Sequence, residues 1–104
     1  MLVKGFKEIK QSSNGRYTLY VDETTRQARI HLHFNGESLT SGTGQYEVTG
    51  FVPTEYCPPK NVIAPLDRWN DFDFYLWSGG TIGVLNNSGS TKTITVDVQV
   101  DYTF

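Results

Sequence analysis

Apolar and polar residues alternate with a period of two along much of the chain. The clearest case runs from Ala28 to Phe34, where apolar residues alternate with Arg29, His31 and His33. Successive side chains of a β-strand point to opposite faces, so this pattern predicts a strand with its apolar residues inward and its polar residues outward. No window keeps apolar residues at helical spacing for long, and helix is therefore not expected.

The same reasoning predicts a weak strand over 3–9 and further strands over 16–21, 45–51, 61–66, 71–77, 81–85 and 91–104. Asn14-Gly15 and Asn35-Gly36 are dipeptides that tolerate the positive φ of tight hairpins, and glycine-rich segments at 41–44, 78–80 and 87–90 indicate other turns. We therefore predict an all-β fold, a jelly-roll-like β-barrel or sandwich of about 7–8 antiparallel strands. Residues 1–104 are expected to form a single domain.

Composition narrows the possible partners. The 104 residues carry nine basic and eleven acidic side chains, for a net charge of −2, without a basic stripe. Nucleic acid is therefore not an expected partner. Apolar runs are only a few residues long, which argues against membrane insertion. The single cysteine, Cys57, has no internal partner for a disulfide and is expected to be a small packed residue.

The segment from Asp67 to Trp77 is rich in aromatic and acidic residues. If Phe72, Phe74 and Leu76 face the core, the alternate residues face outward together. Flat rings stack on the apolar face of a pyranose while carboxylates accept hydrogen bonds from its hydroxyls, so this row predicts a saccharide site. The alternative is that one tryptophan caps the barrel and the other packs against a neighbouring subunit. The outward row consists of Trp69, Asp71, Asp73, Tyr75 and Trp77, and His33 is a candidate from an adjacent strand.

Other chemistry is less well supported. His31 and His33 have a spacing compatible with a metal site, but two histidines and one cysteine leave too few ligands without added carboxylates. Asp71 and Asp73 are spaced like a glycosidase pair, yet neither has an evident cleft. There is no nucleophile elbow and no phosphate-binding loop. We therefore expect a binding protein that is not an enzyme and that needs neither a metal nor a cofactor.

The stretch from Phe51 to Pro65 resembles a segment common in phage tail-fibre and baseplate proteins: a proline, two residues, a tyrosine, then proline-lysine and a short apolar strand. A strand over 71–77, a glycine turn at 78–80 and another strand from Thr81 follow here. Over about its second half, the chain resembles the C-terminal head domain of a receptor-binding protein from a siphophage of lactococci or related Gram-positive hosts. The resemblance also implies that residues 1–11 are the end of a neck segment that precedes the head domain.

The resemblance further implies a homotrimer in the virion, at the extracellular tip of the tail baseplate. Host cell-wall polysaccharide would be the ligand, and other baseplate proteins would bind through a preceding N-terminal region. Family sites combine a tryptophan and an aspartate with a histidine and an arginine. The matching candidates in this chain are Trp69 or Trp77, Asp71 or Asp73, His33 and Arg68.

Two other interpretations remain open from the sequence. One is a structural or protein-interaction trimer, such as a tumour-necrosis-factor-like or complement-like head or a baseplate connector, with both tryptophans buried at subunit contacts. The other is a fragment of a wall-polysaccharide depolymerase that uses Asp71 and Asp73. The first predicts no sugar binding, and the second predicts release of reducing ends.

Overall fold

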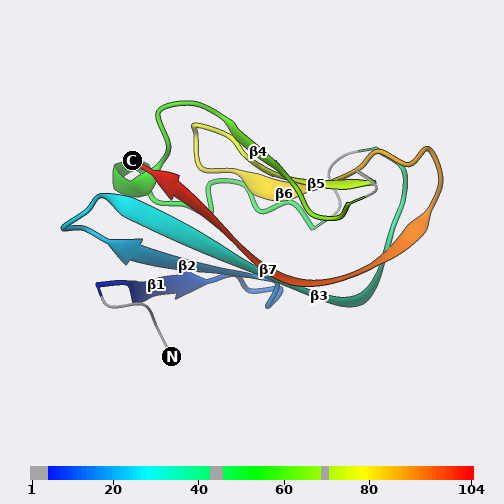
Figure 1. Ribbon diagram of the computed structural model, residues 1–104, viewed down its shortest axis with the longest axis horizontal. Coiled ribbons are helices and arrows are strands. Elements are labelled where there is room, and N and C mark those ends of the chain that lie inside the picture. Colours follow the sequence, from blue (N-terminus) through cyan, green and yellow to red (C-terminus); the bar gives the residue numbers. More distant parts are fainter. Residues whose placement is uncertain (1–4, 43–45, 69–70) are drawn as a thin grey trace.

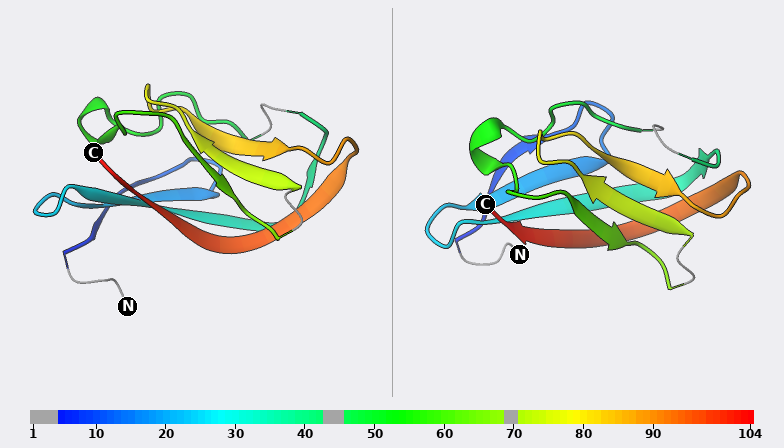
Figure 2. Two further views of the ribbon diagram at one scale, coloured as in Figure 1. Left: turned by 45° about the horizontal axis from the view of Figure 1, so that its top comes forward. Right: turned by 90° about the horizontal axis from the view of Figure 1, so that it is seen from above.

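The computed structural model describes residues 5–42, 46–68 and 71–104, which fold into two antiparallel sheets packed face to face (Figures 1 and 2). The first sheet has four strands in the order β1-β2-β3-β7, and the second has three in the order β4-β5-β6. The predicted all-β fold is confirmed, as a sandwich of seven strands. Their bounds are β1 Lys7–Gln11, β2 Tyr17–Asp22, β3 Gln27–Leu39, β4 Val62–Pro65, β5 Phe72–Leu76, β6 Ile82–Asn86 and β7 Lys92–Thr103.

The chain builds each sheet from consecutive hairpins and then returns to the first sheet. β1, β2 and β3 follow one another, the chain crosses to β4, β5 and β6, and β7 comes back to pair with β3. The connection from β3 to β4 contains a short 3-10 helix, η1 (Thr54–Tyr56), which lies beside the end of β7 (Figure 1). In the part of the chain that the structure describes, no helix has the length and apolar character that would let it cross a membrane.

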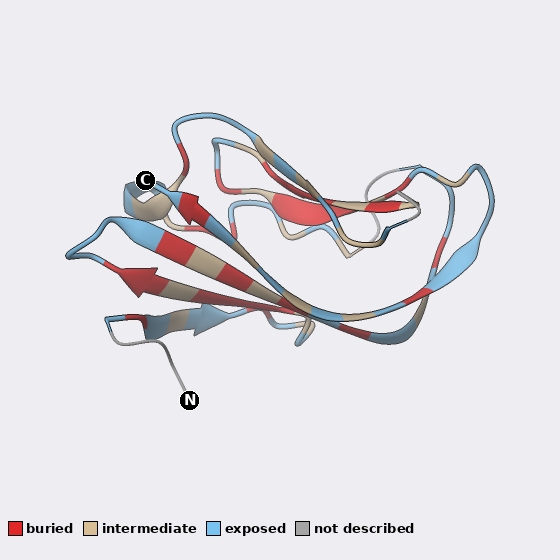
Figure 3. Ribbon diagram, viewed as in Figure 1, coloured by how far each residue is buried: buried red, intermediate tan, exposed pale blue. Residues whose placement is uncertain are grey.

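The alternation predicted for β3 is confirmed. Ala28, Ile30, Leu32 and Phe34 are buried in the core, whereas the residues between them are at least partly exposed. Figure 3 shows this alternation as bands of red and lighter colour along β3. Neighbouring strands add their own inward rows, because cross-strand partners share a face. The principal inward contributors from β2 and β5 are Tyr17, Leu19, Val21, Phe72, Phe74 and Leu76.

Asn35-Gly36 does not form the hairpin turn that its sequence suggests. β3 continues through it to Leu39, and the register with β7 shifts between Phe34 and Glu37. Gly36 has φ +69° and donates its backbone N–H to the Thr95 hydroxyl at 2.9 Å. The left-handed glycine therefore makes a β-bulge, which bends a strand without reversing it. Asn14-Gly15, by contrast, lies in the turn between β1 and β2, as predicted.

The strand predicted over 45–51 is wrong for its described residues, 46–51. Only Val48 pairs there, through an isolated bridge to Ile82 of β6. Tyr46 and Gly50 have φ +58° and +63°, and such left-handed residues on both sides of Val48 interrupt an extended ladder. Tyr46 is held by a hydrogen bond from the Tyr17 hydroxyl to its carbonyl oxygen at 2.8 Å. The segment from 46 to 51 therefore lies along the β6 edge as a loop. The first strand, predicted over 3–9, begins at Lys7 in the structure.

Cys57 lies where this loop meets the core, and the expectation of a packed residue is confirmed. Its side chain is half-buried against the core, with Sγ 3.5 Å from the carbonyl oxygens of Val52 and Pro53. Burial, followed by the nearby Glu55 carboxylate, raises the pKa of the thiol. A raised pKa disfavours the reactive thiolate.

Candidate functional site

The outer face of the three-stranded sheet brings together three of the seven predicted saccharide-binding residues: Asp73, Tyr75 and Trp77. Cross-strand pairing places Ile63, Tyr75 and Gly83 in one row, and Pro65, Asp73 and Leu85 in the next. Trp77 follows Tyr75 with the same parity and continues the hairpin, donating its backbone N–H to the Thr81 carbonyl at 2.9 Å. We call the surface formed by Ile63, Asp73, Tyr75, Trp77, Gly83 and Leu85 the outer platform.

Tyr75 forms the floor of the outer platform, where the sequence predicts an exposed ring. It is only 1% exposed, yet it does not belong to the core cluster, so it is buried from the outer side. Its ring lies across Gly83 of β6, and its hydroxyl donates a hydrogen bond to Glu47 Oε2 at 2.5 Å. Burial, followed by this hydrogen bond, raises the pKa of the Tyr75 hydroxyl. The ring is therefore fixed at both ends.

Trp77 lies on top of Tyr75. The two ring centroids are 4.6 Å apart and the planes differ by 24°, so the rings are stacked. Trp77 is only half-buried. Because one face of the indole is covered by a rigid ring, its orientation is set before any ligand arrives, and such preorganisation lowers the entropic cost of binding. Asn61 supports this end of the hairpin by accepting a hydrogen bond from the Ser78 backbone N–H at 2.8 Å.

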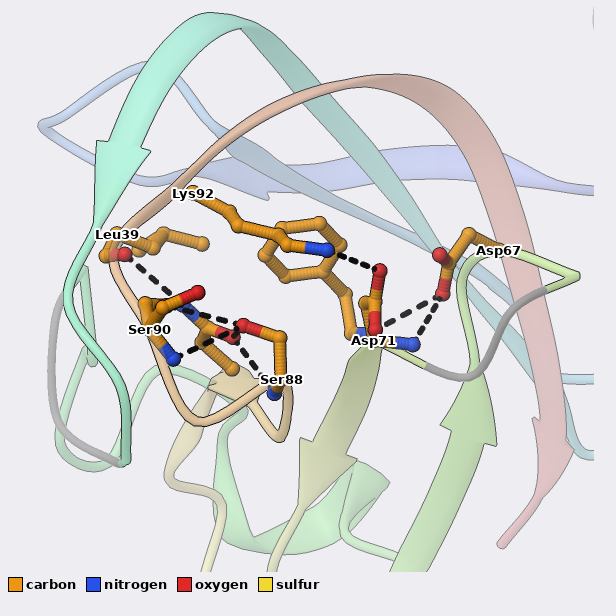
Figure 4. A network of polar contacts seen from close by, with 8 residues as sticks. Leu39, Asp67, Asp71, Ser88, Ser90 and Lys92 are labelled. Atoms are coloured by element: carbon orange, nitrogen blue, oxygen red, sulfur yellow. Dashed lines mark hydrogen bonds and ion pairs between the residues drawn. The ribbon is translucent and has the colours of Figure 1, made fainter.

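The two aspartates of the predicted row have different surroundings. Asp73 lies on the outer platform and accepts a hydrogen bond from Asn87 Nδ2 at 2.7 Å. Asp71 lies two residues earlier, directly before β5, and its carboxylate pairs with Lys92 Nζ of β7 at 2.9 Å (Figure 4). Asp67 caps this corner by accepting the backbone N–H of Asp71 at 3.0 Å. Asp71 therefore connects the two sheets at the rim, while Asp73 is the carboxylate presented on the platform.

The remaining predicted residues do not join this set. His33 projects from β3 on the outer face of the other sheet, on the opposite side of the sandwich, where it pairs with Asp97 of β7. The idea that His33 completes the site is therefore wrong for a single subunit. Arg68 lies on the exposed connection before β5 and has interactions of its own. Trp69 lies outside the described residues.

His31 and His33 share one acidic neighbour. Asp97 contacts His31 Nε2 with one carboxylate oxygen, and its other oxygen is 4.0 Å from His33 Nδ1. The hydrogen bond to His31 lowers the pKa of the Asp97 carboxyl. Across residues 5–42, 46–68 and 71–104, no group of three or more histidine, cysteine or acidic side chains is placed to hold a metal ion.

Several residues that shape the outer platform were not identified from the sequence. Glu47 comes from the loop beside β6 and becomes a partner of Tyr75 only through folding, and Asn87 reaches Asp73 from the end of β6. Gly83 was visible as a small residue within a strand, a position that often marks a close approach by another group. That signal could have indicated that a side chain lies across it.

Replacing Gly83 with alanine is expected to lower the free energy of unfolding by about 1–3 kcal/mol, the usual cost of overpacking. A Cβ there would lie under 3.0 Å from the Tyr75 hydroxyl and ring, so the ring must lift and disturb the Trp77 stack. Urea denaturation and near-ultraviolet circular dichroism measure both effects. Gly79→Ala is the matched control, because a Cβ at Gly79 meets nothing within 4 Å. Equal stability of the two variants would contradict this packing.

Comparison of the chain with protein-family models, with curated proteins and with solved structures finds no match.

Proposed function

We propose that the chain is the receptor-binding head domain of a phage tail and that it binds host cell-wall saccharide through the outer platform. The observation that carries the proposal is the half-buried Trp77, stacked at 4.6 Å on a Tyr75 that is itself fixed by Glu47. A rigid aromatic surface beside the Asp73 carboxylate offers a stacking face and a hydrogen-bond acceptor, which is what a neutral sugar needs. The assignment to a phage rests on the sequence resemblance of the second half of the chain.

In this proposal the domain acts as a homotrimer at the baseplate, without catalysis and without a cofactor. Three identical platforms on one head, repeated around a tail tip, convert weak single contacts into strong attachment, because each further contact is effectively intramolecular. Arg68 and Asp71 lie next to the segment that leads into β5, and we assign them to the rim of the saccharide site. Trp69, which lies outside the described residues, stays a saccharide-binding candidate from the sequence alone. His33 would contribute only as part of a neighbouring subunit.

Removing the Trp77 ring is expected to weaken saccharide binding at least about tenfold, which corresponds to about 1.4 kcal/mol. The loss follows because the stacking face disappears while the folded sheet remains. Calorimetric titration with cell-wall polysaccharide purified from lactococci measures it in wild type, Trp77→Ala and Trp77→Phe. The phenylalanine variant keeps a ring and should retain most of the affinity.

Trp69→Ala serves as the second tryptophan variant and shows whether the effect belongs to Trp77. An unchanged affinity of Trp77→Ala, in a variant that light scattering and circular dichroism show to be folded, would refute the outer platform as the saccharide site. Reducing ends released during the titration would instead support a depolymerase.

A second candidate function is a structural or protein-interaction trimer. Ile63 of β4 favours this second function. Its side chain is 57% exposed, and among the described residues it is the large hydrophobic side chain that is exposed to solvent. Polysaccharide binding by the wild type separates the two functions, and Ile63→Ser tests whether this side chain holds a trimer together. Loss of the trimer in light scattering, together with absence of polysaccharide binding by the wild type, would favour the interaction module.

A further inference from the structure

A pocket lies at the end of the sandwich, where the β2–β3 turn, η1 and the end of β7 meet. It has a volume of about 380 Å³ and is lined by Glu23, Arg26, Glu55, Tyr56 and Phe104. This volume falls within the range of small-molecule pockets. None of these residues belongs to the outer platform, so this end pocket is independent of the saccharide proposal.

Two aromatic rings form the fixed wall of the end pocket. Tyr56 and Phe104 meet edge to face, with centroids 5.3 Å apart and planes at 79°. The Tyr102 hydroxyl donates to the Tyr56 carbonyl at 2.8 Å, and the Phe104 backbone N–H donates to the Arg26 carbonyl at 3.0 Å. The rings are thus held by main-chain anchors from β7 and from the β2–β3 turn.

The end pocket is lined by two carboxylates, and one of them is bound to the Tyr56 hydroxyl. Tyr56 donates a hydrogen bond to Glu23 Oε1 at 2.6 Å. This hydrogen bond, followed by burial and by the charges of Glu23 and Glu55, raises the pKa of the Tyr56 hydroxyl. The Glu23 carboxylate is therefore placed at the Tyr56 hydroxyl, and Glu55 lines the same pocket. Neither forms a salt bridge with any residue in the described ranges.

Arg26 is the cation of the end pocket, and its side chain lies on the Phe104 wall. The guanidinium lies 4.8 Å over the Phe104 ring, and Nε donates to the Phe104 carbonyl at 3.0 Å. Arg26 has φ +56°, a left-handed conformation that glycine would adopt without strain. The arginine thus fixes Phe104 without a salt bridge to either carboxylate, and the two glutamates and one arginine give the pocket lining a net charge of −1.

From these observations we infer that the end pocket binds the primary ammonium group of an organic ligand. Glu23 and Glu55 accept its N–H groups in charge-assisted hydrogen bonds, which are the stronger kind. Tyr56 and Phe104 contact the carbon atoms next to the nitrogen, and the Tyr56 ring adds a cation–π contribution, since Arg26 already lies over Phe104. An amino sugar and a lysine side chain carry the same group, and the experiment below distinguishes them.

The test titrates the ¹⁵N-labelled protein with four probes and follows the backbone amides of Tyr56, Cys57 and Phe104. Glucosamine is compared with N-acetylglucosamine, and Nα-acetyl-lysine methylamide with its Nε-acetylated form. At least one amine should bind about tenfold more tightly than its acetylated counterpart, because acetylation removes the charge. The amine that binds more tightly identifies the carrier.

Glu55→Gln should weaken binding of that amine at least about fivefold, and Glu23→Gln gives a second variant if the first is unfolded. Glu8→Gln on exposed β1 is the matched control and should bind like the wild type. The inference is overturned if neither amine shifts these amides, if the acetylated probes bind equally well, or if a folded pocket variant binds like Glu8→Gln. Trp77→Ala should leave amine binding unchanged, so the failure of one site can be told from the failure of the other.

Discussion

Asn86→Asp is expected to lower the free energy of unfolding at pH 7 by about 3–5 kcal/mol, the cost of an uncompensated buried charge. Asn86 ends β6 and is 2% exposed. Its Nδ2 donates to the carbonyl oxygens of Leu39 and Ser90, each at 2.9 Å. A carboxylate would set an acceptor against these two acceptors and remove the Asn86 donor from both, although the Ser90 carbonyl still accepts from the Ser88 hydroxyl at 2.9 Å. Figure 4 shows how this network closes the turn between β6 and β7 beneath the end of β3.

The defect of Asn86→Asp should depend on pH. Burial and the two facing carbonyls raise the pKa of the introduced carboxyl in the folded state above its unfolded value of about 3.9. Below that value the group is neutral in both states and can donate to one carbonyl. The loss therefore grows as pH rises from about 3.9 to the folded pKa and is constant above it.

Urea denaturation of Asn86→Asp and wild type at pH 4 and pH 7 measures this dependence. Asn35→Asp is the control, because Asn35 is exposed and an aspartate there should change stability little. A difference from wild type that is small at pH 7, or that widens toward pH 4, would contradict the buried network.

The second large effect is expected for Gly80→Ala, which should lose about 2–5 kcal/mol of unfolding free energy. Gly80 has φ +97°, and a Cβ there would lie under 3.0 Å from the Val52 carbonyl oxygen. The left-handed conformation costs an alanine about 1–2 kcal/mol and overpacking about 1–3 kcal/mol. Backbone cannot move aside as a flexible side chain can, because Val52 also donates its N–H to the Gly80 carbonyl at 3.0 Å.

Gly79→Ala again provides the comparison, one residue away in the same turn, with no neighbour for its Cβ and no positive φ. Thermal and urea unfolding should therefore show a lower free energy of unfolding for Gly80→Ala than for Gly79→Ala, although the two variants have the same amino-acid composition. A Gly80→Ala protein as stable as Gly79→Ala would show that the loop carrying Val52 does not lie against the β5–β6 hairpin.

The sequence predicts which face of a strand is buried much better than it predicts what lies beside that face. Period-two alternation identified the inward rows of β3 and β5, because burial on one side of a pleated strand leaves that pattern directly. It does not predict that β3 and β5 belong to different sheets, and for this reason His33 is a candidate for the saccharide site from the sequence although it lies on the other sheet. The sheet to which each strand belongs depends on the crossover after β3, and no local sequence pattern encodes this crossover.

Glycine and asparagine positions show a second limit. Asn35-Gly36 and Asn14-Gly15 have the same local preference for positive φ, yet one forms a bulge and the other a turn. Long-range pairing with β7 decides between them. Likewise, Tyr75 has outward parity but is buried, because Gly83 leaves space for its ring and Glu47 holds its hydroxyl. Parity gives the direction of a side chain, and only tertiary contacts give its exposure.

The placement of β1 and β7 on opposite edges of one sheet determines how the domain responds to mechanical load. Lys7 pairs with Val21 and Thr103 with Gln27, so the start of β1 and the end of β7 lie at the same end of the sheet. Tension between these two points acts across the strands, along their hydrogen bonds, and separates the pairs one at a time. β7 is anchored there through Tyr102 and Phe104, whereas β1 is mostly exposed. Under tension β1 should therefore peel away first, leaving the six remaining strands, with the outer platform and the end pocket, in place.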